Sequence, residues 1–248
     1  MFQQTHIDQL GRKLTLSSTP KRIVCLVPSL TELLAYFELE QEVVGITKFC
    51  IYPEDWFKAK ERVGGTKTID IDKIKSLHVD LIIGNKEENT KEDIEALMLI
   101  APVWMSDVNS IEDTYHLIAS LSGIFNKEEL GAQLNRDLQS YFQLHATEGA
   151  GKSVLYFIWH NPGFVAGKNT YIDSYLGALG YRNCVSVERY PDANTIGEIK
   201  PDVVFLSSEP FPFQESHVSY YQSLFPDAEI KLVDGERYSW YGVRTLRC

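Results

Sequence analysis

Aromatic and acidic side chains gather in short polar segments that follow apolar runs of this sequence. The segments SEPFPF (208–213) and RYSWYG (237–242) hold more aromatic area than a turn requires. Aromatic rings with a few polar groups line pockets for large flat ligands, so we expect a tetrapyrrole or an aromatic metal chelate. Glu87 and Glu209 lie in equivalent segments. They would bind amide or cationic groups of the ligand or, alternatively, stay solvated at the rim of the binding site. Further candidate ligand contacts in such segments and beside them are Tyr52, His160 and Arg244.

The sequence motifs of common catalytic sites are absent. The chain contains no GxSxG, HExxH, GxxxxGK[ST] or GxGxxG. Its six histidines are scattered singly, and we expect neither a metal site nor an intrinsic cofactor. We therefore predict binding without catalysis. One alternative is a chelatase that inserts metal into a tetrapyrrole, with His160 as the base that takes the pyrrole protons. Another is a cytoplasmic ligand sensor or buffer with the same fold.

A pattern that occurs twice indicates how these segments are positioned. Residues 72–88 read DKIKSLHVDLIIGNKEE, and residues 198–209 read EIKPDVVFLSSE. Each copy is the end of a short polar helix, then an apolar run typical of a strand buried in a parallel sheet, then a polar loop. Such loops lie at the carboxyl ends of the strands, where open α/β sheets bind ligands. The repeat predicts two similar lobes, unless it is a chance likeness of two ordinary αβ units.

A long helical stretch separates the two copies. Residues 111–146 read as helix, interrupted near Asn126, and an apolar stripe at helical spacing follows that interruption. We predict an N-terminal α/β lobe over 1–125, a connecting helix over 126–146 and a C-terminal α/β lobe over 147–248. The alternative is a surface helix of one continuous domain. Near the start of the chain, Ser29 and Glu32 predict a capping box at a helix N-terminus.

Composition and charge narrow the partners. The 248 residues carry a net charge of −10, which disfavours nucleic acid because that partner requires a basic surface. The first residues lack the features of a secretory signal, and no run approaches the 18 apolar residues of a transmembrane helix. We expect a cytoplasmic monomer with reduced cysteines. The four cysteines show no metal-ligand spacing, and Cys25 lies within an apolar run.

Several blocks of the sequence resemble a known family. RIVCLVPSLTELLAYFELEQEVVGIT (22–47), SVLYFIWHNPGFVAGKNTYIDSYLGALGYRN (153–183) and PDVVFLSS (201–208) are similar to class III substrate-binding proteins of ABC importers. The vitamin B12-binding branch is the most similar. The resemblance implies two Rossmann-like α/β lobes joined by one long rigid helix. A cobalamin, haem or iron-siderophore ligand would lie in the cleft between the lobes.

The resemblance also implies particular residues. The ligand-facing loops would include Phe49, Thr66, Asn85, Trp159, Tyr190, Glu236 and Trp240. B12-binding members carry tryptophan at the positions of Thr66 and Asn85, so a different chelate is a rival to cobalamin. The acids that dock on the ABC permease map to Asp72 and to Asn194, or to Glu198 with a shift of the alignment. The family precedent is a periplasmic or cell-envelope location.

Overall fold

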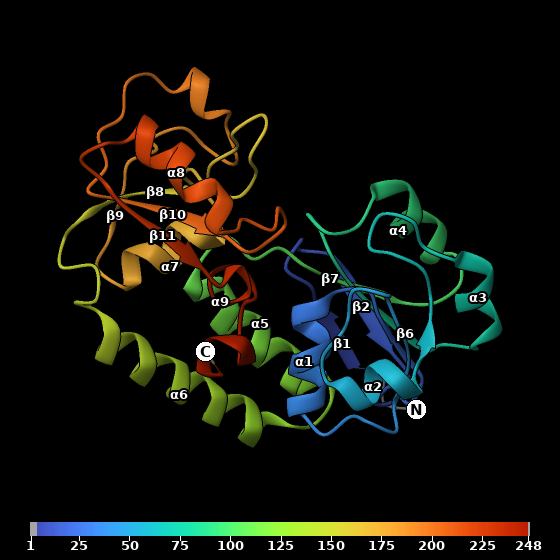
Figure 1. Ribbon diagram of the computed structural model, residues 1–248. Helices are drawn as coiled ribbons and strands as arrows, with labels where there is room; N and C mark the ends of the chain where they lie inside the picture. Colours follow the sequence, from blue (N-terminus) through green and yellow to red (C-terminus); the bar gives the residue numbers. More distant parts are fainter. Residues whose placement is uncertain (1–3, 248) are drawn as a thin grey trace. The chain divides into compact units, whose positions relative to one another are not determined.

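Two units, each built around its own parallel sheet, make up the computed structural model, which describes residues 4–247 (Figure 1). The first unit runs to Val108 and includes Asp113–Arg136. The second holds Asn109–Glu112 and all described residues from Asp137 onward. The predicted α/β class with two parallel sheets is confirmed. The division at residues 125 and 147 stays a prediction.

The sheet of the first unit has five parallel strands in the order β5-β4-β3-β6-β7. The strands are β3 (Ile23–Cys25), β4 (Val43–Ile46), β5 (Glu61–Arg62), β6 (Leu81–Asn85) and β7 (Val103–Ser106). Every residue of β3, β6 and β7 is buried, as expected for strands covered on both faces. The apolar runs of the sequence therefore mark this sheet, and its carboxyl ends carry the predicted loops.

The helices of the first unit are α1 (Pro28–Tyr36), α2 (Glu54–Ala59), α3 (Ile71–Ser76), α4 (Lys91–Leu97) and most of α5 (Ile111–Ile124). Side-chain caps begin two of them, because Asp70 accepts a hydrogen bond from Lys73 N and Thr90 accepts one from Asp93 N. The predicted capping box of α1 is wrong. That helix begins at Pro28 and Ser29 lies inside it, since proline has the backbone angle of the first helical position and needs no cap for its missing N–H.

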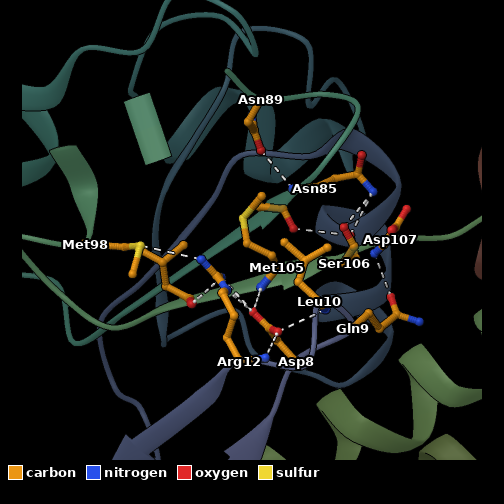
Figure 2. A network of polar contacts seen from close by, with 12 residues as sticks. Asp8, Gln9, Leu10, Arg12, Asn85, Asn89, Met98, Met105, Ser106 and Asp107 are labelled. Atoms are coloured by element: carbon orange, nitrogen blue, oxygen red, sulfur yellow. Dashed lines mark hydrogen bonds and ion pairs between the residues drawn. The ribbon is translucent and has the colours of Figure 1, made fainter. Parts of the chain in front are cut away.

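An antiparallel hairpin precedes this sheet and was not predicted. It consists of β1 (Gln4–Ile7) and β2 (Lys13–Leu16). Asp8, in its connection, accepts hydrogen bonds from Leu10 N, Arg12 N and Met105 N, and pairs with the Arg12 guanidinium (Figure 2). This buried carboxylate therefore helps to attach the hairpin to β7, together with the Gln9 N–H and the Arg12 guanidinium, which donate to the carbonyls of Met105 and Val103.

Helix α6 (Glu128–His145) extends over 18 residues, or about 27 Å. Asn126 precedes it with a left-handed φ of 54°, which separates it from α5. Of the stripe that the sequence spacing predicted, Leu134, Leu138 and Phe142 are buried, and Leu130 and Tyr141 are half-buried. The boundary between the two units falls inside this helix, after Arg136.

The second unit has a four-stranded parallel sheet in the order β11-β10-β8-β9. Its elements are β8 (Ser153–Phe157), α7 (Tyr171–Ala178), β9 (Arg182–Asn183), η1 (Ala193–Thr195), β10 (Val203–Ser207), α8 (Glu215–Leu224), β11 (Glu229–Val233), α9 (Gly235–Ser239) and η2 (Val243–Leu246). Neighbours on β8 point to opposite faces, so Phe157 packs on Tyr221 of α8 while Tyr156 packs on Tyr238 of α9. Helices therefore cover both faces of this sheet.

The two copies of the sequence repeat differ in one element. In the first copy, α3 precedes β6; in the second, residues 198–200 before β10 are not helical. The predicted second helix is wrong because Pro201 disfavours helical geometry at Lys200, and Gly197 has a φ of 81°. Among residues 4–247, no helix has the length and apolar character needed to cross a membrane.

Candidate functional site

The loop after β4 presents aromatic rings of the first unit. Phe49 is 50% exposed and Tyr52 is 37% exposed, whereas Cys50 between them is fully buried. Thr47 holds the base of this loop, since its hydroxyl lies 3.1 Å from Cys50 Sγ and accepts a hydrogen bond from Phe49 N. The loop therefore has a packed base with aromatic side chains outside it. This arrangement suits contact with a flat ligand.

Asn85 and Thr66 shape the neighbouring loops of the same unit. The Asn85 side chain is buried, accepts hydrogen bonds from Glu87 N and Glu88 N, and donates to Ser106 Oγ at 3.0 Å (Figure 2). Thr66 is also buried, and its carbonyl accepts a hydrogen bond from the Asn89 amide. These bonds give both residues a role in loop geometry. Their role as ligand contacts stays a prediction, and Lys86, Glu87 and Glu88 are the exposed residues of this loop.

Four predicted residues of the second unit lie together at the ends of β10 and β11. Glu209 accepts a hydrogen bond from Ser239 Oγ at 2.6 Å, and the indole of Trp240 lies close to its carboxyl group. The Arg244 guanidinium lies 5.1 Å from the centre of the Trp240 ring, and its Nη1 is 3.3 Å from Glu236 Oε2. Burial raises the pKa of Glu209 above its ordinary value, and Ser239, Trp240 and Arg244 oppose that shift.

We name this group of five residues the indole cluster: Glu209, Glu236, Ser239, Trp240 and Arg244. Sequence reasoning missed Ser239. Its position directly before Trp240, at the end of a predicted polar loop, was the available signal.

Trp159 and His160 follow β8 and belong to a second aromatic group. Trp159 is 40% exposed and meets the edge of Phe211 at 5.6 Å between ring centres. The half-buried His160 turns toward α8, where its Nδ1 lies 3.2 Å from the Tyr221 hydroxyl and its ring lies 5.0 Å from that of His217. Trp159 is thus available at the surface, while His160 is packed among aromatic rings.

The remaining predicted residues lie apart from these groups. Tyr190 is half-buried beneath the Arg189 guanidinium, 5.6 Å from its ring centre. Asp72 is exposed in the first turn of α3, and Asn194 is exposed in η1, where it donates to Asp192 Oδ1. The predicted role of Tyr190 in ligand binding, and those of Asp72 and Asn194 in permease docking, stay predictions. Within the described residues, no three His, Cys, Asp or Glu side chains are arranged to hold a metal ion.

Two parallel α/β units with aromatic loops at their strand ends define the class of bilobal solute-binding proteins. Comparison with known sequences specifies the family, since residues 23–216 match the periplasmic binding proteins. The chain belongs to that family.

Individual relatives agree with this assignment. An uncharacterized ABC transporter substrate-binding lipoprotein of Bacillus subtilis, YvrC, is 25% identical over 75% of this chain. The match spans 62% of that relative, less than two thirds of its length.

Solved structures share the fold. The vitamin B12-binding protein BtuF of Vibrio cholerae has a TM-score of 0.76 at 21% identity, over 92% of this chain and 93% of its own. The siderophore-binding protein BauB, solved with acinetobactin and ferric iron, has a TM-score of 0.81 at 18% identity, over 99% of this chain and 95% of its own. At these identities the likeness establishes the fold alone.

Proposed function

We propose that this protein binds a metal chelate or tetrapyrrole, such as a corrinoid, haem or ferric siderophore, and delivers it to an ABC-type importer. One observation carries the proposal: exposed aromatic side chains follow the carboxyl ends of strands in both sheets. Phe49 and Tyr52 follow β4, and Trp159 follows β8. Loops at this edge of an α/β sheet are its usual ligand-binding elements. The family and the ligands named for BtuF and BauB support the same class of ligand.

We propose binding without a chemical step on the ligand. The chelatase alternative needs His160 as a base that can reach pyrrole protons. His160 instead contacts Tyr221 through Nδ1 and packs against Phe211 and His217. These contacts favour a structural role for its ring. The family assignment supports the same conclusion.

The importer partner and the compartment are further parts of the proposal. Exposed Asp72 is available to a basic surface of a permease, whereas Asn194 would contribute no charge. The lipoprotein and periplasmic relatives favour delivery at the outer side of the cytoplasmic membrane. Cell fractionation of the native protein tests this, because recovery in the cytoplasm would support the location expected from the sequence and contradict an importer role.

The binding proposal is tested by titration with cyanocobalamin, haemin and a ferric catecholate, monitored by tryptophan fluorescence. We expect saturable quenching by at least one of them. Replacing one ring, by Phe49→Ala or by Trp240→Ala, should raise Kd about tenfold, which corresponds to about 1.4 kcal/mol for one aromatic contact. Leu144→Ala is the matched control, since Leu144 is 78% exposed on α6, away from the strand ends. No saturable response to any of the three ligands would overturn the proposal.

A further inference from the structure

Two charged residues restrain the Trp240 side chain from two directions. Its indole lies close to the Glu209 carboxylate, which accepts a hydrogen bond at 2.6 Å from the hydroxyl of Ser239, the preceding residue. Charge-assisted hydrogen bonds of this kind are shorter and stronger than bonds between neutral groups. The Arg244 guanidinium lies over the ring at 5.1 Å. The indole is therefore restrained both along its edge and on one face.

The restraining groups are themselves fixed. Arg244 is bound by Glu236, and their side chains are only 12% and 20% exposed. Gly235 packs so closely that a Cβ built on it would lie 2.5 Å from Glu209 Cγ. Helix α9 begins behind Asp234, whose side chain accepts a hydrogen bond from Glu236 N. The restraints on Trp240 thus come from a packed corner of the second unit, in which little can move independently.

The charges around the indole are unequal. Glu209, Asp234 and Glu236 are acidic, and Arg244 is the basic residue whose charge acts on Glu209 together with that of Asp234. Arg237, although next in the chain to Glu236, is bonded elsewhere, to Tyr141 and Glu148. Three carboxyl groups against one guanidinium leave the surroundings of Trp240 with net negative charge. Such surroundings repel an anionic ligand and tolerate a neutral or cationic one.

We propose that Glu209 is a positioning residue that holds Trp240 as a preformed stacking surface, and that this acidic surface selects neutral or cationic planar chelates over anionic ones. The selectivity half rests on the proposed function, whereas the positioning half is independent of any ligand. A ring held in one orientation before binding loses little conformational entropy when the ligand arrives. A corrinoid, whose periphery is made of amides, fits these surroundings better than a ferric tris-catecholate, which is anionic.

The positioning half is tested without a ligand, in a Trp159→Phe background. Trp56 and Trp104 are 5% and 0% exposed, so acrylamide quenching of the Trp159→Phe variant reports mainly on Trp240. We expect Glu209→Ala to increase the quenching constant about twofold, toward that of an exposed indole, while Glu209→Gln, which keeps an acceptor oxygen, stays near the parent value. Asp227→Ala is the control, because Asp227 is an exposed carboxylate of the same unit. Circular dichroism verifies that each variant is folded. Equal quenching in Glu209→Ala and the control would overturn the positioning role.

The selectivity half is tested by Kd values for cyanocobalamin and for ferric tris-catecholate. We expect the neutral corrinoid to bind more tightly, and Glu209→Gln to narrow the ratio of the two Kd values roughly fivefold by removing one charge. A catecholate that binds as tightly as the corrinoid would overturn the selectivity. If cyanocobalamin, the ferric catecholate and haemin all fail to bind, the selectivity and the proposed function are both overturned. The quenching result still decides the role of Glu209.

Discussion

The Asp8 carboxylate is the point at which a single substitution should most affect the first unit. Its side chain is 1% exposed and lies 2.6 Å from Arg12 Nη2, and it accepts backbone hydrogen bonds from Leu10, Arg12 and Met105 (Figure 2). Asp8→Ala would leave the Met105 N–H and the Arg12 guanidinium without this acceptor. The hairpin of β1 and β2 would lose one of its links to β7, while the Gln9 N–H would still donate to the Met105 carbonyl.

The magnitude follows from the burial of the pair. Removing one partner of a buried ion pair costs about 3–5 kcal/mol, because the other charge stays desolvated. Arg12 is 32% exposed and also donates to the Val103 carbonyl, so we expect the lower end, about 3 kcal/mol. Asp8→Asn keeps one acceptor oxygen but loses the charge, and about 1–2 kcal/mol is expected.

Urea unfolding of the full chain, followed by circular dichroism, measures these changes in the free energy of unfolding. Glu54→Ala is the control, since the Glu54–Lys58 ion pair is exposed on both sides and should contribute little. Amide hydrogen exchange at Met105 locates the effect, because its N–H loses its acceptor in Asp8→Ala. A loss below about 1 kcal/mol for Asp8→Ala, or unchanged exchange at Met105, would refute the reasoning.

Two further predictions concern groups that the packing constrains. Burial raises the pKa of the Cys25 thiol to about 12 and raises that of Cys50, so at pH 8 only about 1 in 10,000 Cys25 side chains is a thiolate. Iodoacetamide should therefore modify half-buried Cys184 long before Cys25 or Cys50, and mass spectrometry that finds Cys25 modified first contradicts this. Gly235→Ala should destabilise the protein by about 1–3 kcal/mol, because its Cβ would lie 2.4 Å from Ser207 Oγ. Gly177→Ala on α7, where a Cβ meets nothing within 4 Å, should be neutral or stabilising in the same thermal melts, and equal effects of the two would be inconsistent with this packing.

The class of fold could be read from the sequence because strand burial leaves a local pattern. The apolar runs Leu81–Ile83 and Val203–Leu206 predicted strands covered on both faces, and they lie within β6 and β10, whose residues are all buried. The stripe of Leu134, Leu138 and Phe142 likewise predicted α6, since a helix repeats its buried face every three to four residues. These features depend on residues close in sequence.

What each site residue contacts depended on the tertiary structure. Asn85 and Thr66 were predicted to face a ligand. Their hydrogen-bond partners, Ser106 for Asn85 and Asn89 for Thr66, lie more than 20 residues away in the sequence. The attachment of Asp8 to Met105 has no signal in the sequence, because nothing local relates two residues 97 positions apart.

The indole cluster combines both kinds of information. The sequence by itself placed Glu209 and Trp240 in polar loops after strands, rich in aromatic residues. It could not show that the two side chains lie close together, since their proximity requires β10 and β11 to lie side by side in parallel register. Residue types and their periodicity thus determined which loops carry chemistry. Only the sheet, by bringing distant strand ends together, decided which side chains meet.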